Sequence, residues 1–329
     1  MLKRIYLYTR LVNPSEADMK HLYSICNDHK ISLQSITVPK EIVQNSSDSL
    51  IICDAPSEIS LLKQYHIPLI YLNRGTNIFG ADLETDTLQA LDYDTLQKVY
   101  HRFFHLPLVI GKRKLGKAAT ANTNQQLILR ELTEEDYENV CAVLNTTTER
   151  FVRFDQKDDY LSYINQTYAF YDYGLFGVFL SDTDKTECFI GLCGFSATTH
   201  PELDGDLCFS AAINALLENS YLELSYLIAP DKQRNGYGKK AISIALRYAA
   251  KTLHVPGVFT IIKDSNPASL KLAEAFAMKA SRKTSLNYSL YTYDFLKENE
   301  RIANAVSNVI AHNNEHPDTS VYFKVYDKK

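Results

Sequence analysis

The amino-acid sequence predicts an α/β protein made of two units, first a small parallel sheet and then a mixed, mostly antiparallel sheet flanked by helices. Near the start of the chain, three short β-rich runs alternate with helical patterns, which is typical of parallel strands joined by crossovers. Later, two β-rich runs meet across a short polar turn and form a meander. A polar stretch without periodicity, residues 111–126, separates the two patterns and is expected to be a linker.

The first unit is expected over residues 1–110 and is Rossmann-like. Its strands are predicted at residues 4–8, 49–53 and 67–72. Apolar residues at helical spacing predict helices from Ser15 to Cys26, from Pro56 to Tyr65 and over residues 92–105.

One segment of this unit, ICDAPSEISLLKQYHIPLIYLN, resembles the late strand–Asp–helix–strand portion of haloacid-dehalogenase-type domains. In that family, an Asp at the position of Asp54 helps to hold magnesium. The family's D-x-D nucleophile motif should follow the first strand, but the chain reads IYLYTRLVN there. We therefore expect a degenerate, non-catalytic domain in which Asp54 is a strand-end or helix-capping residue.

The second unit is expected over residues 127–329. A start of capping-box type, Thr133 to Asp136, precedes its first helix. The next elements are expected to be a helix over 156–171, meander strands at 175–180 and 188–195, an insertion at 196–220, a strand at 222–228, a helix from Gly238, the strand VFTII, a helix from Pro267 to about Met278, and the strand LNYSLYTYDF. Residues 298–311 predict a further helix and residues 321–326 a last strand.

The composition restricts the class of partner. The 329 residues are 45% hydrophobic and carry a net charge of −4, so no overall basic field favours nucleic acid. The six cysteines show no C-x-x-C pair and no metal-ligand spacing, and we expect free thiols in a reducing compartment. No apolar run approaches the roughly 18 residues of a membrane span. A cytoplasmic protein without nucleic acid, membrane or metal is expected, and a homodimer stays open.

The most informative stretch joins an apolar strand to an amphipathic helix through a glycine-bearing turn, Gln233 to Gly238. Because the first amides of a helix lack intrahelical partners, and the helix dipole is positive there, such a start favours an anion. About thirty residues later, Asn266 is a good helix cap, with Pro267 at the first helical position. The asparagine can act as a cap alone or as a cap and a ligand contact.

The order of elements and two motifs resemble the GCN5-related N-acetyltransferase (GNAT) superfamily over the C-terminal two-thirds of the chain. Gln233, Gly236 and Gly238 match that family's phosphate loop, Q/R-x-x-G-x-G/A, and Asn266 and Ser269 match its later N-x-x-S element. The segments LILRELTEEDYENV and ELSYLI look most like the branch of ribosomal-protein N-terminal acetyltransferases.

The resemblance implies acetyl-coenzyme A as co-substrate and a primary amine as acceptor, either a protein N-terminus or a small molecule. The central strand would pair with the pantetheine arm and offer an amide to the thioester oxygen, while the backbone N–H groups of the turn would hold the diphosphate. The residues expected to bind the co-substrate are Tyr226, Leu227, Ile228, Gln233, Arg234, Asn235, Gly236, Tyr237, Gly238, Lys239, Asn266 and Ser269.

Acyl transfer to an amine needs a base for the amine and a proton for the departing thiolate. Glu223 is the expected base, acting through water, and partial burial would have to raise its pKa. Its alternative role is a strand carboxylate for pairing or substrate recognition. Family members often carry a tyrosine acid where this chain has Ala273. Ser269 is therefore the expected acid, with Tyr226 in reserve.

Two other functions remain open. The chain could be a non-catalytic acyl-coenzyme A sensor or an interaction protein, a reading that Ala273 favours. The pattern Gly236-x-Gly238-x-x-Ala241 also fits the fingerprint of NAD(P)-binding Rossmann enzymes. In that fingerprint the first glycine follows the strand almost directly, whereas residues 229–235 intervene here.

Overall fold

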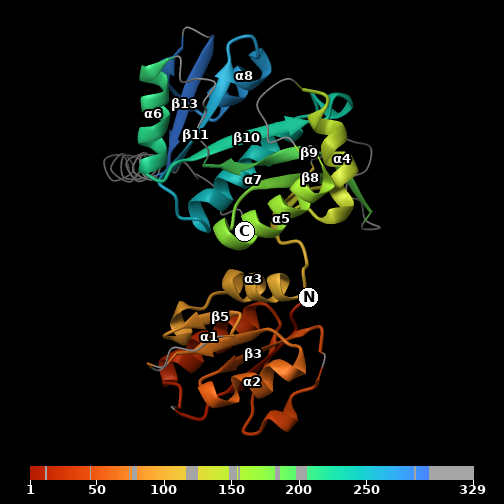
Figure 1. The fold of residues 1–329 in the computed structure, drawn as a ribbon, viewed down its shortest axis with the longest axis vertical. Helices are drawn as coiled ribbons and strands as arrows, with labels where there is room; N and C mark the ends of the chain where they lie inside the picture. Colours follow the sequence, from red (N-terminus) through yellow and green to blue (C-terminus); the bar gives the residue numbers. More distant parts are fainter. Residues whose placement is uncertain are drawn as a thin grey trace, which may run out of the picture. The chain divides into compact units, whose positions relative to one another are not determined.

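A computed structural model of the chain describes residues 1–295, except 12, 45, 74, 76–79, 116–124, 148–153, 155, 182–185, 198–205 and 285–286. The chain divides into two compact units (Figure 1). The first comprises Met1–Val109 and Arg130–Thr133, and the second comprises Ile110–Leu129 and Glu134–Lys329.

The first unit contains a five-stranded sheet whose pairs are all parallel, which confirms the predicted fold class. Its order is β2-β1-β3-β4-β5. The strands are β1 (Arg4–Tyr8), β2 (Ser32–Ser35), β3 (Ser49–Cys53), β4 (Leu69–Leu72) and β5 (Leu83–Thr85). The three predicted strands form the centre of the sheet. The two outer strands were not predicted, because they are short and lack a buried apolar run.

The helices of this unit begin where the sequence predicts. Ser15 caps α1 (Glu16–Asp28) in a capping box with Asp18, and Asp92 caps α3 (Tyr93–Phe103). The segment between β3 and β4 is a run of short turns: η2 (Pro56–Glu58), α2 (Ile59–Leu62) and η3 (Lys63–Tyr65). Two further short turns are η1 (Pro39–Glu41) and η4 (Leu88–Ala90).

Asp54 lies fully buried directly after β3. Its carboxylate accepts hydrogen bonds from the backbone N–H of Arg10, at 2.6 Å, and of Leu11, at 3.2 Å. It therefore orders the loop that follows β1, as a strand-end residue, and the η2 turn begins without a side-chain cap. The described residues hold no group of three or more His, Cys, Asp or Glu that could bind a metal ion. The likeness to haloacid dehalogenases stays a prediction.

The second unit contains an eight-stranded sheet of order β12-β13-β11-β10-β9-β8-β7-β6. The pairs β8/β9, β9/β10, β11/β13 and β12/β13 are antiparallel, and β10/β11 is parallel, so the predicted mixed sheet is confirmed. The strands are β6 (Val109–Lys114), β7 (Gln126–Arg130), β8 (Leu175–Ser181), β9 (Glu187–Ser196), β10 (Leu222–Ile228), β11 (Gly257–Lys263), β12 (Lys279–Lys283) and β13 (Tyr288–Asp294).

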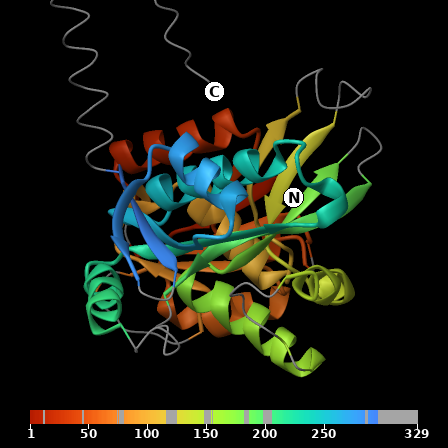
Figure 2. The ribbon, with the colours of Figure 1, turned by 90° about the horizontal axis from the view of Figure 1, so that it is seen from above.

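Helices cover both faces of this sheet (Figure 2). They are α4 (Tyr137–Leu144), which follows the turn η5 (Glu134–Asp136), then α5 (Lys157–Tyr171), α6 (Leu207–Glu218), α7 (Tyr237–Lys251), which follows the turn η7 (Pro230–Lys232), and α8 (Pro267–Ala275). Helix α7 packs against β9, β10 and β11, while α4 packs against β9 and β10 on the opposite face. The expected insertion contributes α6, whose Phe209 and Ile213 pack against Phe259 and Leu290.

Two boundaries differ from the prediction. The predicted linker is wrong for residues 111–114, which form the end of β6, where Gly111 lies against Ile244 of α7, and for Gln126, which begins β7. The predicted helix to Met278 ends earlier, at Ala275, because Ala277 takes a left-handed conformation (φ 53°) that stops the helix. The helix predicted at 298–311 and the strand predicted at 321–326 lie outside the described residues.

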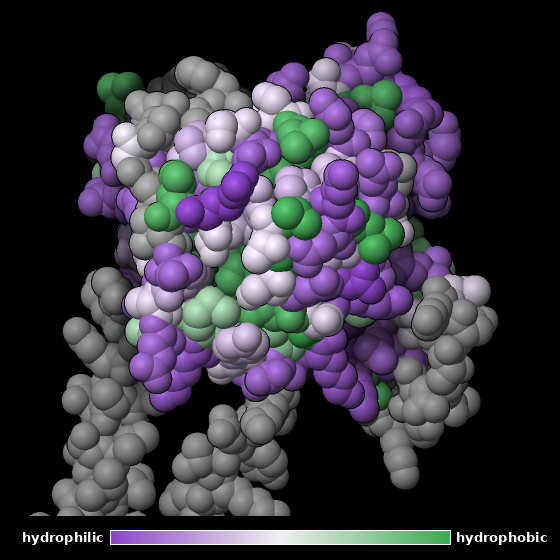
Figure 3. All heavy atoms as spheres, turned by 90° about the horizontal axis from the view of Figure 1, so that it is seen from below, coloured by the Kyte–Doolittle hydropathy of each residue, from purple (hydrophilic) through white to green (hydrophobic). Residues whose placement is uncertain are grey.

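All six cysteines are free thiols, as expected. No helix in the described part of the chain is both long and apolar enough to cross a membrane. On the face drawn in Figure 3, hydrophobic side chains form several separate groups among hydrophilic ones.

Candidate functional site

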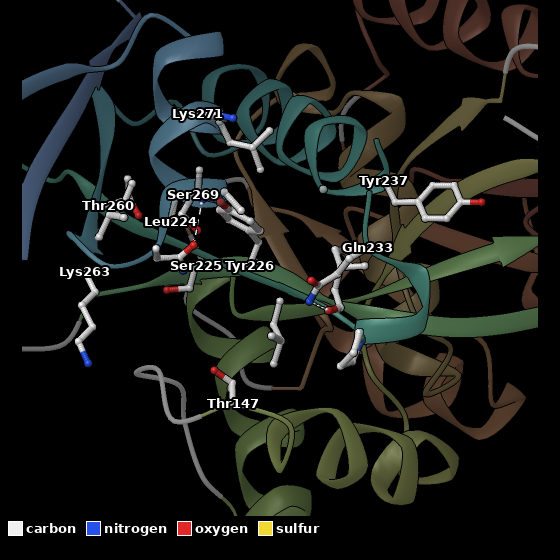
Figure 4. Close-up of a pocket in the computed structure, with 18 of the residues that line it drawn as sticks. Thr147, Leu224, Ser225, Tyr226, Gln233, Tyr237, Thr260, Lys263, Ser269 and Lys271 are labelled. Atoms are coloured by element: carbon white, nitrogen blue, oxygen red, sulfur yellow. Dashed lines mark hydrogen bonds between the residues drawn. The ribbon is translucent and has the colours of Figure 1, made fainter. Parts of the chain in front are cut away.

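The candidate site is a cavity of about 640 Å³ between β10 and β11 (Figure 4). Each of these parallel strands is seven residues long, yet they pair only at Leu222↔Val258 and Glu223↔Phe259. Beyond this pair the strands separate. The opening is lined by both strands, by the loop that follows β10 and by α8, and its volume lies in the range typical of ligand sites.

The peptide groups on the open side of β10 are free to meet a ligand. On the other side, the Ala229 N–H donates to the Ile190 carbonyl, and the Leu227 carbonyl faces Gly191 of β9 so closely that a Cβ at Gly191 would lie 2.2 Å from it. Because successive peptide groups of a strand point to opposite edges, the N–H groups of Tyr226 and Ile228 point towards the cavity.

The loop after β10 forms a cradle of backbone amides. The Gln233 side chain donates to the Ile228 carbonyl at 2.9 Å, which fixes the loop to the strand end. Arg234 (φ 64°) and Gly236 (φ 74°) both take left-handed conformations, and α7 begins directly after Gly236. Within the described chain, no backbone N–H from Arg234 to Lys239 donates a hydrogen bond. Six amides at a helix start are thus available to an anion.

The ammonium of Lys240 lies at this cradle. Its Nζ is 3.5 Å from the position that a Cβ would take at Gly236. A cation at the N-terminus of a helix is unfavourable because the helix dipole is positive there. No carboxylate of the described residues forms an ion pair with Lys240. Its position therefore favours an anionic ligand.

We expect Lys240→Gln to weaken the binding of an anion such as pyrophosphate at this cradle about tenfold, because one charge-assisted hydrogen bond contributes about 1.5 kcal/mol. The free protein should unfold at the same or a slightly higher temperature, since the substitution removes a cation from a helix N-terminus. Titration calorimetry and thermal unfolding measure the two effects. Lys251→Gln, at the opposite end of α7, is the matched control, and an equal loss of affinity in both variants would contradict the assignment.

Tyr226 and Ser269 lie close together in the cavity (Figure 4), and Asn266 lines the same cavity. Asn266 caps α8 by accepting the Ser269 N–H at 3.1 Å. The Tyr226 hydroxyl is buried and makes no hydrogen bond within the described chain. Burial raises the pKa of Tyr226 to about 12, and the nearby Ser269 hydroxyl opposes this shift. A buried phenol without a partner favours a ligand that completes its hydrogen bonding.

Glu223 lies at the closed end of the cavity, where β10 and β11 still pair. It is 6% exposed, and its Oε2 accepts a hydrogen bond from Ser196 Oγ at 3.4 Å. A carboxylate in this position is shielded from bulk water and still borders the ligand space. Ala273, which stands where family members often carry a tyrosine acid, is buried within α8 and lines no part of the cavity.

Most of the predicted site residues line one cavity, but Asn235 and Lys239 do not. The Asn235 side chain instead donates to the carbonyls of Lys232 and Gln233 and so braces the loop. Sequence reasoning missed Thr146, Thr147, Ser225, Thr260, Lys263, Lys271, Leu272 and Tyr288. The alternation of side chains along β11 and β13 could have indicated Lys263 and Tyr288, but only with the strand register in hand.

A dinucleotide site of Rossmann type is not supported by this geometry. Residues 229–235, which include the turn η7, lie between the end of β10 and Gly236, whereas in that fingerprint the first glycine follows the strand almost directly.

Residues 126–279 match the family model described as acetyltransferase (GNAT) domain. This match confirms the expected acyltransferase class. No curated protein matches the chain.

Three solved structures are similar to about half of the chain. Mutant forms of the spermidine/spermine N-acetyltransferase SpeG from Vibrio cholerae are 16% identical, with a TM-score of 0.39, and the match covers 53% of this chain and 97% of that chain. A domain from Methanocaldococcus jannaschii DSM 2661 is 16% identical, with a TM-score of 0.39, and the match covers 52% of this chain and 100% of that chain. An acetyltransferase from Agrobacterium tumefaciens str. C58 is 18% identical, with a TM-score of 0.38, and the match covers 51% of this chain and 90% of that chain.

Proposed function

We propose that this chain, whose residues 126–279 match the model of the GNAT acetyltransferase domain, moves an acetyl group from acetyl-coenzyme A directly to a primary amine. One observation carries the proposal: a cavity between separated strands ends at a helix start whose six leading amides have no partner within the described chain. A long ligand with a diphosphate at one end suits this shape. The diphosphate would accept hydrogen bonds from those amides, and the rest of the ligand would lie along the open edge of β10.

In this proposal the cradle from Arg234 to Lys239 and the Lys240 ammonium hold the diphosphate. The pantetheine arm lies along β10 and pairs with its open edge. The N–H groups of Tyr226 and Ile228 are then available to the thioester oxygen, where negative charge develops during attack. Fixed backbone donors aimed at such a charge form an oxyanion hole.

Glu223 supplies the base. The acceptor nitrogen must lose a proton before its lone pair can attack the acetyl carbon, and Glu223 takes that proton, through a water molecule. A new C–N bond then forms and the C–S bond breaks, leaving a thiolate. The nitrogen gives up its second surplus proton, which neutralises the thiolate, so that the products are the amide and the free thiol. Because Glu223 is 6% exposed, its negative charge meets little competition from bulk solvent when it attracts the acceptor ammonium.

The thiolate leaves beside Tyr226 and Ser269. With the pKa of Tyr226 at about 12, its hydroxyl stays protonated at neutral pH. A phenol of that pKa is a weaker acid than a thiol, whose ordinary pKa is about 8.5, so full proton transfer to sulfur is unfavourable. Tyr226 and Ser269 therefore stabilise the thiolate as hydrogen-bond donors, a different role from the proton donor that the sequence suggested.

The test is release of free thiol from acetyl-coenzyme A in the presence of a panel of primary amines, including peptide N-termini. We expect thiol release that depends on both the amine and the protein, with an acetylated amine visible by mass spectrometry. Tight binding of acetyl-coenzyme A without turnover on any amine would favour the sensor instead. A protein that neither binds nor turns over acetyl-coenzyme A would contradict the proposal altogether.

Other expectations remain proposals of the same kind. These are an acceptor of the ribosomal-protein type, a cytoplasmic location, a homodimer, and a first unit that is a separate, non-catalytic domain.

A further inference from the structure

The cavity has two faces, which the side-chain alternation of β10 separates. A Cβ at Gly238 of α7 would lie 3.7 Å from Ile228 and 3.9 Å from Tyr226, so these two side chains face α7. Because successive side chains of a strand point to opposite faces, Glu223 and Ser225 point away from α7, to the face that α4 covers. The proposed co-substrate cradle belongs to α7, so this other face is where an acceptor would approach.

Lys263 lies on this second face. Phe259 and Ile261 of β11 pack against α6, so Lys263, two residues further along, points to the same side. Tyr288 of β13 stands directly opposite Lys263 in the antiparallel register. Figure 4 shows Lys263 and Thr147 on one side of the strands and Lys271 on the other.

The two charged side chains on this face have opposite signs and lie towards opposite ends of the cavity. Among the described residues that line it, Glu223 is the carboxylate and Lys263 the ammonium. Lys263 is exposed and has no ion pair within the described chain. The neighbouring Asp264 does not pair with Lys263. Its carboxylate instead forms an ion pair with Lys283 at 2.5 Å and accepts a hydrogen bond from the Ser289 hydroxyl at 2.8 Å.

The separation of the two charges sets the size of a matching molecule. Glu223 stands opposite Phe259, and Lys263 is four residues further along β11. At about 3.3 Å per residue, four residues span about 13 Å. A molecule with an amine near the closed end and an anion towards the open end would satisfy both charges.

We propose that Lys263 binds an anionic group of the acceptor, an inference that rests on the proposed acetyl transfer. The acceptor class is then an amine that carries a carboxylate some distance from its nitrogen. Glu223 attracts the ammonium end, and Lys263 selects the acidic end. A polyamine, with a second cation in place of the anion, would meet Lys263 with the same sign of charge and would be disfavoured.

The test compares matched acceptors: alanyl tripeptides and tetrapeptides with a free C-terminal carboxylate, of which the tetrapeptide spans about 13 Å when extended, and the same peptides as C-terminal amides. We expect the wild-type protein to show a kcat/KM at least about fivefold higher for one of the carboxylates than for its amide. Lys263→Gln should lower kcat/KM for the carboxylate much more than for the amide, which removes the preference. Lys263→Glu should reverse it. Lys279→Gln, on the exposed edge strand β12, is the control with the same change of charge and should keep the preference.

The inference fails if the wild-type protein acetylates amides or polyamines as well as the carboxylates, or if the preference survives Lys263→Gln. Either result leaves the acetyltransferase proposal intact, because thiol is still released. Absence of thiol release with every amine contradicts that proposal itself, and the two failures are therefore distinguishable.

Discussion

Gly236→Glu is expected to abolish acetyl-coenzyme A binding, with a loss of affinity of at least about a hundredfold, or about 3 kcal/mol. Gly236 has a φ of 74°, a conformation that non-glycine residues adopt only at a cost of about 1 kcal/mol. A Cβ there would lie 3.5 Å from the Lys240 ammonium, so a glutamate carboxylate can reach both this cation and the free amides. It would occupy the cradle as an internal anion. Titration calorimetry with coenzyme A measures the loss.

Gly236→Asn is the matched control for this experiment. Asparagine tolerates the left-handed conformation better than other residues and carries no charge. We expect its effect on affinity to be several-fold smaller than that of glutamate. If Gly236→Glu binds coenzyme A as tightly as the wild-type protein, the diphosphate does not lie in this loop.

Glu223→Gln is expected to lower turnover by about two orders of magnitude near neutral pH, the usual contribution of a general base. The loss should be largest at low pH, where the acceptor amine is protonated and needs a base, and should shrink at high pH, where free amine supplies the nucleophile. A profile of kcat/KM against pH, with the same acceptor for both proteins, measures this. Equal rates across the profile would exclude Glu223 from the mechanism.

Two controls separate chemistry from structure at this position. Glutamine keeps the volume of the glutamate side chain and can still accept the hydrogen bond from Ser196, so the melting temperature should change little. Ser196→Ala removes only that long hydrogen bond, of 3.4 Å, and should lower turnover far less than Glu223→Gln.

The strongest sequence signals were local and chemical. The alternation of β-rich and helical runs predicted the parallel strands of the first unit, and the meander predicted the antiparallel pair β8/β9. The spacing of Gln233, Gly236 and Gly238 predicted a loop that begins a helix, because a left-handed residue and a helix start both depend on the local sequence. Caps such as Ser15 and Asn266 were found for the same reason.

The errors fall where neighbouring strands decide the outcome. Residues 111–114 are polar and basic and resemble a linker, yet they form an edge strand, since backbone hydrogen bonds to a neighbour need no apolar pattern. The early end of α8 depends on the left-handed Ala277, a residue that gives no such signal in sequence.

By itself, the sequence determined the two α/β units and the glycine loop with its helix start. It also determined Asn266 and Ser269 of the later motif and the acidic Glu223 at the start of β10. Only the tertiary structure decided that β10 and β11 separate after two residue pairs, because the register between strands far apart in the chain depends on packing from both faces. That separation creates the cavity that Lys263 and Glu223 both line. These residues are ordinary in the sequence because their roles depend on neighbours that only the fold supplies.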